Sequence, residues 1–533
     1  MITLQTLWPE GAGELLVSVS SLAIDSRQVQ AGGLFFALQG TAQPERMAQF
    51  VQQAIARGAV LVLSESPVAL DSPSLVPICI VPDLRHQMGL ISRRFLQAQQ
   101  AVQPVRVAAV TGTNGKTTIS RLLAELLVGA GQRCAVMGTT GNGIVPNLTP
   151  STHTTLDALS LQQHLHEYAE QGARFACLEA SSHGLEQGRL AGTPIEVAIF
   201  SNLTRDHLDY HGTLAAYAEA KSRLFAFPEV HTAIVNADDP ASAAMIAAAS
   251  ASVRVWRYSM VADSQADFYV QQACYSLTGA TLQVATPDGV VTLHSPLLGR
   301  FNVANLLAAV AGASALGVPM AHIVQAVPHL IGAAGRMQVI DDPSRLLVVD
   351  YAHTPDALTQ VLSSLRPHVQ GQLWVVFGCG GDRDRGKRPL MTAAALAHAD
   401  QLILTADNPR SESVEAILAD MQADLHASDH DHLWVEPDRR LAIRLAIAHA
   451  QAGDAVVLAG KGHEDYQEIA GVRHWFDDAI EMRQASIARP TVDTPDAMQA
   501  TASATTGKTD ADGRQCAADS SRPFSSSVTP DTP

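Results

Sequence analysis

The chain of 533 residues carries 36 lysines and arginines against 52 aspartates and glutamates, a formal net charge of −16. This acidic balance argues against a general nucleic-acid or anionic-membrane binder, because such proteins need an excess of cations to neutralise phosphates. Hydrophobic residues make up 47% of the chain, but no apolar run is long enough to cross a membrane. At about 150 residues per domain, the length predicts roughly three domains.

The compartment follows from the cysteines and the first residues. The six cysteines form no CxxC pair, which argues against a zinc site and fits a reducing cytosol. The opening stretch lacks the basic and apolar regions of a signal peptide. We therefore expect a cytoplasmic monomer that binds neither nucleic acid nor membranes.

Residues 1–102 have the pattern of a small α/β domain. A strand is predicted over 34–38, a helix over 47–57 and a second strand over 60–63. A Gln/Ala stretch closed by Pro104 marks the end of this domain.

Residues 103–333 predict a central domain with a parallel sheet. A strand at 105–110 leads through a glycine turn into an amphipathic helix at 117–128. Further apolar runs alternate with helical patterns, as a parallel sheet requires: 175–178, 197–200 and 233–235. Residues 253–295 resemble a β-rich insert with a hairpin turn at Asp288-Gly289.

Residues 334–488 predict a third α/β domain. Each of its strands ends in a polar or glycine-rich loop: 346–349, 373–377, 402–404 and 455–458. Ligands of open parallel sheets bind at such strand ends. The composition of residues 489–533 offers little to bury, and we expect a disordered tail without a catalytic role.

The clearest motif is GTNGKTT at residues 112–118, between a strand and a helix. Glycines let backbone N–H groups approach phosphate oxygens, and the helix N-terminus adds a partial positive charge. Lys116 would neutralise the β- and γ-phosphates, and the Thr117 hydroxyl would bind Mg²⁺. The strict P-loop pattern has a glycine where this chain has Val110, and an ordinary turn with a surface lysine is the alternative. We predict a nucleotide site.

Two further strand ends carry metal-binding side chains. Glu179 ends one predicted strand, and His207 follows the next. A carboxylate and an imidazole suit a divalent cation that bridges the γ-phosphate and an acceptor oxygen. Taken alone, a carboxylate next to a helix cap and a solvated histidine would be the better interpretation.

Several ordered motifs together resemble the Mur ligase family. Besides residues 112–118 they are EASSH (179–183), DHLD (206–209), KSRLF (221–225), GRFNVAN (299–305), DYAHTP (350–355) and GKGHE (460–464). The resemblance covers about residues 107–480. It implies an α/β fold of three domains: a UDP-sugar-binding domain, a central P-loop-type ATPase and a Rossmann-like C-terminal domain.

The resemblance also implies roles for the central residues. Lys116, Lys221 and His207 would be catalytic, and Lys221 would be carbamylated by CO₂. A carbamate is an oxygen-rich anion that can bind Mg²⁺, whereas an ammonium group cannot. Without the family, Lys221 would be a solvated cation in the helical pattern 217–227. The implied metal set is Thr117, Glu179, His207 and carbamylated Lys221, and the implied ATP set is Gly112, Thr113, Asn114, Gly115, Lys116, Thr117, Thr118, Asn302, Arg336, Asp350 and His353.

The implied UDP-sugar-peptide site spans the first two domains. Its residues are Ile24, Ser26, Thr41, Ala42, Gln43, His153, Thr154, Thr155, Ser181, Gln187 and Arg189. The first domain departs from the family pattern, because residues 44–47 replace the usual Asp-Gly-His and residues 31–33 replace Pro-Gly-Asp. These departures affect the expected contacts of the sugar nucleotide.

The stretch DNPR at residues 407–410 bears on which amino acid is added. Family members that add diaminopimelate carry it, whereas lysine-adding relatives lack its arginine. An arginine can bind the distal carboxylate by two parallel hydrogen bonds, and a glutamate can bind the distal ammonium. Arg410 and Glu464 supply this pair, although Asp-Asn-Pro alone also suits a turn. The implied set is Arg383, Asp407, Asn408, Pro409, Arg410, Gly460 and Glu464, and Arg385 could replace Arg383.

The sequence therefore predicts an ATP- and Mg²⁺-dependent ligase of peptidoglycan precursor synthesis. It would join meso-diaminopimelate to UDP-MurNAc-L-Ala-D-Glu through an acyl phosphate. Three alternatives remain at this point: a ligase like folylpolyglutamate synthase, a regulatory nucleotide switch, and a non-catalytic paralogue that binds the precursor.

Overall fold

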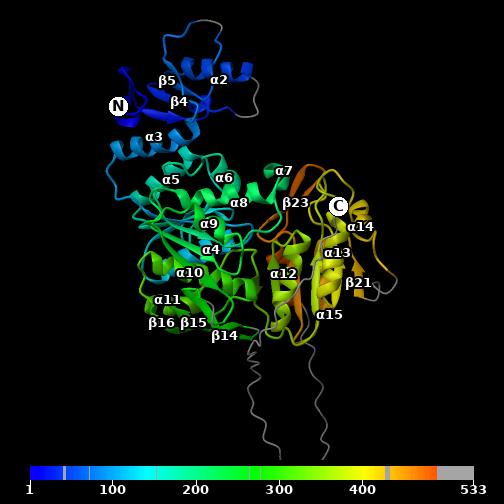
Figure 1. Cartoon of the computed structure of the whole chain (residues 1–533). Helices are drawn as coiled ribbons and strands as arrows, with labels where there is room; N and C mark the ends of the chain where they lie inside the picture. The colour runs from blue at the N-terminus through cyan, green and yellow to red at the C-terminus, as the bar shows by residue number, and fades with distance from the viewer. Residues whose placement is uncertain are drawn as a thin grey trace, which may run out of the picture.

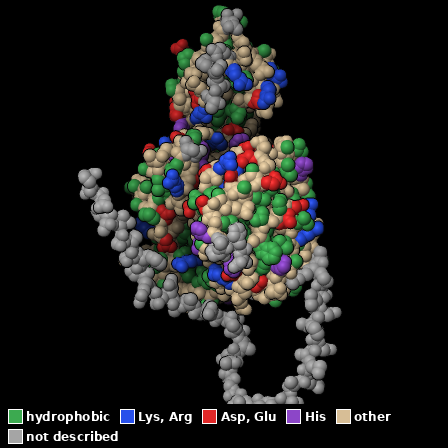
Figure 2. Space-filling view, turned by 90° about the vertical axis from the view of Figure 1, so that its right-hand side faces the viewer, with side chains coloured by type: hydrophobic (Ala, Val, Ile, Leu, Met, Phe, Trp, Pro, Cys, Tyr) green, Lys and Arg blue, Asp and Glu red, His purple; other side chains and the backbone are tan. Residues whose placement is uncertain are grey.

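The computed structural model describes residues 1–39, 44–70, 73–151, 153–262, 265–276, 278–426 and 432–488. Residues Thr41, Ala42 and Gln43 and the tail at 489–533 lie outside the described residues. Three α/β units follow one another along the chain, as the sequence predicts (Figure 1). Figure 2 shows the N-terminal unit as a smaller lobe above a larger body.

The N-terminal unit is built on a four-stranded parallel sheet with apolar clusters on both faces. Its sheet strands are β3 (Ser21–Ala23), β4 (Gly33–Ala37), β5 (Ala59–Ser64) and β6 (Ile78–Ile80), covered by α2 (Pro44–Ala56) and α3 (Leu84–Gln99). The unit begins with β1 (Ile2–Thr3), α1 (Leu4–Leu7) and β2 (Ser18–Val19), followed later by the short turn η1 (Ser26–Gln28).

A ten-stranded sheet forms the central unit, in the order β16-β15-β14-β13-β12-β11-β7-β10-β8-β9. Its strands are β7 (Arg106–Thr111), β8 (Cys134–Gly138), β9 (Gly141–Ile144), β10 (Phe175–Glu179), β11 (Ile195–Phe200), β12 (Thr232–Asn236), β13 (Arg254–Ser259), β14 (Phe268–Ser276), β15 (Gly279–Thr286) and β16 (Gly289–Ser295). The expected insert at 253–295 is thus a continuation of this sheet. The expected hairpin joins β15 to β16, but its turn residues are Pro287 and Asp288, because Gly289 already pairs with Thr286.

Helices cover both faces of the central sheet. One face packs against α4 (Lys116–Gly129), α10 (Arg300–Ala315) and α11 (Met320–Ala326) with the turn η3 (Val327–His329). The other packs against α5 (Ala158–Glu170), α6 (Ser182–Glu186), α9 (Ser242–Ala248) and the turn η2 (Arg223–Ala226). Near this face lie α7 (Leu208–His211) and α8 (Leu214–Ser222). The helical pattern expected over 217–227 therefore changes from α-helix to a 3₁₀ turn after Ser222.

The C-terminal unit has a six-stranded sheet in the order β17-β18-β22-β19-β20-β21, parallel except for β17. The strands are β17 (Gln338–Ile340), β18 (Leu346–Asp350), β19 (Leu373–Phe377), β20 (Gln401–Leu404), β21 (Leu433–Val435) and β22 (Ala455–Ala459). On one face lie α12 (Pro355–Leu365), η4 (Arg366–His368), α13 (Lys387–His398) and α14 (Val414–Met421). On the other lie α15 (Arg439–His449) and α16 (Asp478–Ala488), and a hairpin of β23 (Tyr466–Ile469) and β24 (Val472–Trp475) completes the unit.

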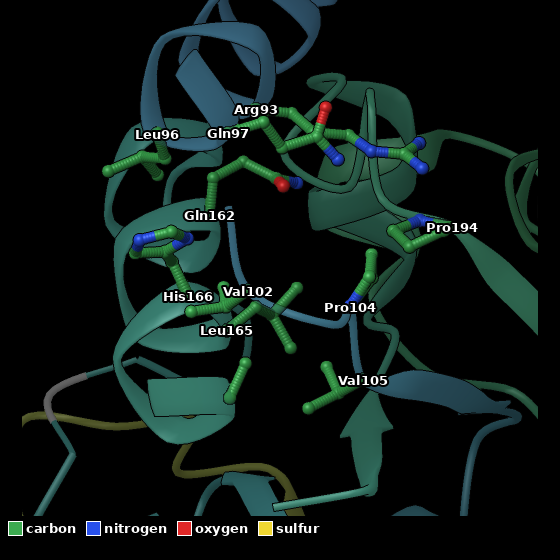
Figure 3. A pocket seen from close by; sticks show the side chains of 11 residues that line it. Arg93, Leu96, Gln97, Val102, Pro104, Val105, Gln162, Leu165, His166 and Pro194 are labelled. Atoms are coloured by element: carbon green, nitrogen blue, oxygen red, sulfur yellow. The ribbon is translucent and has the colours of Figure 1, made fainter. Parts of the chain in front are cut away.

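The N-terminal and central units meet where α3 packs against α5. Gly89 on α3 permits a second contact, with the segment between α6 and β11, because an added Cβ would lie 1.8 Å from the carbonyl oxygen of Ala191. A small, mainly apolar pocket lies at this seam, between α3, residues 102–105 and α5 (Figure 3). It is remote from the strand ends that carry the predicted site. None of the helices in the described ranges combines the length and apolar character needed to span a bilayer.

Candidate active site

The phosphate loop has the geometry that its glycines predict. It joins β7 to α4, and Gly112 and Gly115 have φ angles of +150° and +87°, which side-chain-bearing residues rarely adopt. The Lys116 ammonium donates to the carbonyl oxygens of Gly112 and Thr113, each at 2.9 Å. Burial lowers the pKa of Lys116, and in the described part of the chain this ammonium forms no ion pair. A cation held only by carbonyl groups is ready to receive an anion.

Glu179 lies beside the loop and is only 2% exposed. Its carboxylate accepts hydrogen bonds from the Thr117 hydroxyl at 2.9 Å and from the Thr139 backbone N–H at 2.8 Å. Gly138 makes room for it, since an added Cβ would lie 2.1 Å from Glu179 Oε1. Sequence reasoning missed Thr139. Its position directly after the strand β8 is the one feature of the sequence that could have indicated it.

Lys221 is 1% exposed and lies next to the same loop. Its Nζ donates to the Gly112 carbonyl at 2.7 Å and lies 4.2 Å from the centre of the Tyr217 ring. Burial, with the charge of Lys116 nearby, lowers the pKa of Lys221 well below its usual value. The environment therefore favours the neutral amine, the form of lysine that reacts with CO₂.

His207 begins α7 with a φ of +52°. Its Nε2 lies 3.5 Å from Asp206, and its ring centre is 5.0 Å from that of His183. A second histidine nearby, His211, contacts the Ser182 hydroxyl at 2.9 Å. The turn between β11 and α8 is thus rich in imidazoles near the edge of the sheet where Glu179 lies.

We tested whether these residues fit a divalent cation. No cluster of three His, Cys, Asp or Glu side chains suited to a metal occurs among the described residues. The predicted set contains only Glu179 and His207 of these types, so it depends on the Thr117 hydroxyl and on Lys221. The contact between Thr117 and Glu179 supplies hard oxygen donors, as Mg²⁺ requires. Lys221 fits the set as a carbamate and not as an amine.

The predicted muramoyl-peptide residues of the central unit form one network beside Glu179. The Thr155 hydroxyl donates to the Glu179 carbonyl at 2.8 Å and contacts the Ser181 hydroxyl at 3.0 Å. Arg189 donates to the Thr155 carbonyl at 3.0 Å and to Gln187 Oε1. Two further predicted residues lie on the preceding loop: Thr154, which accepts from Thr139, and His153.

The first unit supports the predicted sugar-nucleotide site less directly. The Ser26 hydroxyl is buried and donates to Gln53 Oε1 at 2.7 Å, and Ile24 packs against the apolar core. Thr41, Ala42 and Gln43, the other predicted contacts in this unit, lie outside the described residues.

The remaining predicted ATP residues lie on the central and C-terminal units. Asn302 is buried on α10, where it bonds the Leu298 carbonyl and Asn305. Asp350 accepts from the backbone N–H groups of Met337 and Ala352, and burial raises its pKa. The Arg336 guanidinium lies 4.5 Å from the Tyr351 ring centre, and His353 donates to the Tyr351 carbonyl. Their approach to a nucleotide stays a prediction.

At the predicted amino-acid site, a buried lysine lies between two carboxylates. The Asn408 amide donates to Glu464 Oε2 at 2.9 Å, and Lys461, which is fully buried, lies 3.5 Å from Glu464 and 3.7 Å from Asp407. An added Cβ on Gly460 would lie 4.0 Å from Asp407 Oδ2. Lys461 belongs to the motif GKGHE at residues 460–464, but the sequence predicted no role for this lysine.

Arg410 lies on the same loop, just after Pro409. Its backbone N–H donates to the Glu468 carbonyl at 2.9 Å, its Nε lies 3.7 Å from the Glu468 carboxylate, and its Nη1 donates to the Gly381 carbonyl at 2.7 Å. Asn408, two residues before Arg410 on this loop, contacts Glu464. The two residues of the predicted clamp therefore lie at one edge of the C-terminal sheet.

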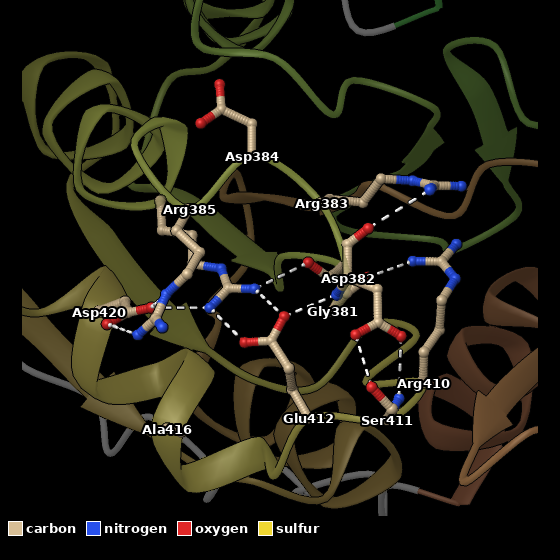
Figure 4. A network of polar contacts seen from close by, with 12 residues as sticks. Gly381, Asp382, Arg383, Asp384, Arg385, Arg410, Ser411, Glu412, Ala416 and Asp420 are labelled. Carbon is tan, nitrogen blue, oxygen red and sulfur yellow. Dashed lines mark hydrogen bonds and ion pairs between the residues drawn. The ribbon is translucent and has the colours of Figure 1, made fainter.

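The structure also separates the two arginines that the sequence left open. Arg385 donates two hydrogen bonds to Asp420, both at 2.9 Å, and turns to the left in Figure 4. Arg383 makes one long hydrogen bond, 3.4 Å, to the Asp382 carbonyl and extends to the right beside Arg410. Of these two arginines, Arg383 is the one whose guanidinium is available for a substrate carboxylate.

Comparison with known proteins agrees with this geometry. Residues 110–313 match the Mur ligase middle domain, and residues 335–462 match the Mur ligase glutamate ligase domain. A UDP-N-acetylmuramoyl-L-alanyl-D-glutamate--2,6-diaminopimelate ligase of Pseudomonas aeruginosa is 44% identical over 489 residues, covering 91% of this chain and 98% of that protein. The chain belongs to the Mur ligase family. The assignment made from the ordered motifs is confirmed.

Further relatives of the family carry the same description. A Vibrio cholerae protein of that name is 42% identical over 86% of this chain and 92% of its own length. A solved structure of a ligase of that name is 53% identical, with a TM-score of 0.74 over 91% of this chain and 99% of that chain. MurF of Acinetobacter baumannii, 22% identical with a TM-score of 0.58 over 86% of this chain and 95% of its own, shares the fold.

Proposed function

We propose that this Mur ligase joins meso-diaminopimelate to UDP-MurNAc-L-Ala-D-Glu at the expense of ATP. The observation that carries the proposal is the loop 407–410, with Arg410 and Asn408–Glu464 at one edge of the C-terminal sheet. Its arginine suits a distal carboxylate and its glutamate a distal ammonium, the two groups that distinguish diaminopimelate from lysine. The relatives from Pseudomonas aeruginosa and Vibrio cholerae are named for this acceptor and amino acid, which supports the proposal.

The domains take the expected parts in this proposal. Residues 1–102 bind the uridine nucleotide, 103–333 bind ATP and the peptide end, and 334–488 bind the amino acid. Thr155, Ser181, Gln187 and Arg189 hold the muramoyl peptide beside Glu179. Arg383 and Arg410 hold the carboxylates of the incoming amino acid, and Glu464 holds its distal ammonium.

The reaction needs two displacements. The terminal γ-carboxylate of the D-glutamyl residue attacks the γ-phosphorus of ATP, and ADP leaves. The diaminopimelate amine then attacks the acyl carbon, the carbon–oxygen bond to phosphate breaks, and the amine loses a proton as the amide forms. Lys116 neutralises the phosphate oxygens and the developing oxyanion.

Mg²⁺ belongs to this proposal as well. The residues that would hold it are Thr117, Glu179, His207 and carbamylated Lys221. When bound, it supplies positive charge that stabilises the transferring phosphoryl group. Among the described residues, the His207 side chain contacts Asp206 and the rings of His183 and Tyr217. These contacts leave the imidazole able to turn toward such an ion.

The alternatives fare worse against the site. Folylpolyglutamate synthase of Mycobacterium tuberculosis is 18% identical with a TM-score of 0.55, and it covers 69% of this chain, so the likeness is one of fold. A nucleotide switch has no use for the charged cluster of Lys461, Asp407 and Glu464. A non-catalytic paralogue would have no need of Lys116, Glu179, His207 and Lys221 together.

The test is a ligation assay with the full chain, UDP-MurNAc-L-Ala-D-Glu, ATP and Mg²⁺. We expect phosphate release that requires meso-diaminopimelate, with L-lysine a poor substitute, and a nucleotide product heavier by one diaminopimelyl residue. Phosphate release that ignores the amino acid, or that prefers L-lysine, contradicts the proposal.

A further inference from the structure

The loops that carry Arg383 and Arg410 are tied together by a third arginine, Arg388, that sequence reasoning did not single out. Arg388 lies in the first turn of α13, and its side chain is completely buried. A buried guanidinium is costly unless its charge and its N–H groups are matched. The hydrogen-bond partners of Arg388 therefore show which segments it fixes in place.

Arg388 donates to three different segments. It forms a two-pronged pair with Glu412, at 2.9 and 2.7 Å, and donates to Asp420 on α14 at 2.7 Å. It also donates to the Gly380 carbonyl at 3.2 Å. Arg385 and Arg388 together carry two positive charges against the two negative charges of Glu412 and Asp420, so the cluster is neutral.

The partners of Arg388 are the neighbours of the substrate arginines. Glu412, two residues after Arg410, accepts from the Asp382 backbone N–H at 2.6 Å. The Asp382 carboxylate in turn accepts from the Ser411 N–H and hydroxyl. Asp382 directly precedes Arg383, so both substrate arginines are next to a residue of this network.

The backbone contact between the two loops is close. Gly381 donates to the Asn408 carbonyl at 2.9 Å, and an added Cβ on Gly381 would lie 1.9 Å from the Pro409 carbonyl oxygen. Arg383 and Arg410 both extend to the right of the network in Figure 4, opposite Arg385. A small change in how the loops pack would change the spacing of the two guanidiniums.

We propose that Arg388 is a positioning residue for amino-acid specificity: through Glu412 and Gly380 it fixes the spacing of Arg383 and Arg410. Lysine cannot replace it, because one ammonium cannot bind Glu412 in two-pronged fashion and also reach Asp420 and Gly380. This inference rests on the proposed function, since it concerns recognition of the two ends of diaminopimelate.

The experiment compares Arg388→Lys with Arg385→Lys in the full chain. Both positions contact Asp420, but only Arg388 contacts Glu412 and Gly380, so Arg385→Lys is the matched control. For each protein we would measure KM for meso-diaminopimelate, for ATP and for UDP-MurNAc-L-Ala-D-Glu, the ratio of kcat/KM with diaminopimelate to that with L-lysine, and the melting temperature.

We expect Arg388→Lys to raise KM for diaminopimelate about ten- to hundredfold and to lower the diaminopimelate-to-lysine ratio, because misplacement of a binding group by about 1 Å has effects of this size. KM for ATP and for the nucleotide dipeptide should stay within about twofold of wild type. Arg385→Lys should match wild type in all of these quantities. Glu412→Gln is the second test and serves if Arg388→Lys folds poorly. It keeps the shape of the Glu412 side chain, and we expect it to change the same quantities as Arg388→Lys.

Two results would overturn the inference: an unchanged diaminopimelate KM and ratio in both Arg388→Lys and Glu412→Gln, or an equal rise of all three KM values. If the wild-type chain itself shows no diaminopimelate-dependent ligation, the proposed function is wrong and the inference falls with it. The wild-type assay thus separates the two failures.

Discussion

The phosphate end and the amino-acid end of the site hold their buried basic side chains in opposite ways. At the phosphate end, Lys116 and Lys221 donate to backbone carbonyls of the loop, and neither has an ion-pair partner in the described ranges. At the amino-acid end, Lys461 lies between Asp407 and Glu464, and Arg388 lies between Glu412 and Asp420.

This difference follows from the charge of what each end receives. A nucleoside triphosphate brings negative charge, so the loop holds the Lys116 ammonium by carbonyl groups and not by a carboxylate. A zwitterionic amino-acid head brings both charges, so the buried basic side chains of its site are already paired with carboxylates and its geometry is fixed in advance.

The largest effect is expected for Lys116→Met. Loss of the cation that faces the phosphates should lower ligation by about 10³-fold, in the range seen when a transition-state donor is removed. Circular dichroism should show an unchanged fold, since no carboxylate loses its partner. Ligation within tenfold of wild type would contradict the role of Lys116.

The second prediction concerns carbamylation of Lys221. Its lowered pKa favours the amine that reacts with CO₂, so ¹³C NMR with ¹³CO₂ at neutral pH should show a carbamate resonance. Lower pH protonates the amine, and the resonance should then disappear. Lys221→Arg should lack both the resonance and ligation. An active wild-type enzyme without a carbamate signal would exclude this modification.

The third prediction compares the same substitution at the two ends, measured in CO₂-free buffer. Lys461→Met leaves Asp407 and Glu464, which are partly buried, without this cation and should cost about 3 kcal/mol of unfolding free energy. In Lys221→Met, folding no longer has to remove the proton from a buried lysine, so the free energy of unfolding should not fall. Equal losses in both variants would refute the contrast between the two ends.

The pH dependence of Lys221→Met sharpens this third test. The folded chain binds the Lys221 proton less tightly than the unfolded chain does, so wild-type stability should rise with pH up to the usual lysine pKa, 10.5. This part of the rise should be absent from Lys221→Met in urea unfolding curves.

The smallest effect is expected at Glu412. The Arg388 guanidinium lowers the pKa of Glu412 from 4.5 to about 2. Its contribution to stability is therefore complete above pH 4.5 and is lost as the pH falls toward 2. The difference in melting temperature between wild type and Glu412→Gln should be constant from pH 6 to 8 and shrink below pH 4.5. A difference that shrinks between pH 8 and 6 would contradict the pairing with Arg388.

Sequence patterns predicted the strand and helix order well, because the buried strands are continuous apolar runs bounded by glycine or polar loops. They did not show that residues 253–295 extend the central sheet, since an edge strand has the same pattern in an insert as in a sheet. At the site, motif spacing placed Glu179 and Arg410 at strand ends. It could not reveal Thr139 or Arg388, whose importance depends on contacts between segments distant in the chain.

The most direct test of the account is the ratio of kcat/KM with meso-diaminopimelate to that with L-lysine in Arg410→Ala. We predict that this ratio falls about a hundredfold, because Arg410 is proposed to bind the distal carboxylate that lysine lacks. KM for ATP should stay unchanged, because the phosphate end does not depend on Arg410. An unchanged ratio, or a parallel rise in KM for ATP, would contradict it.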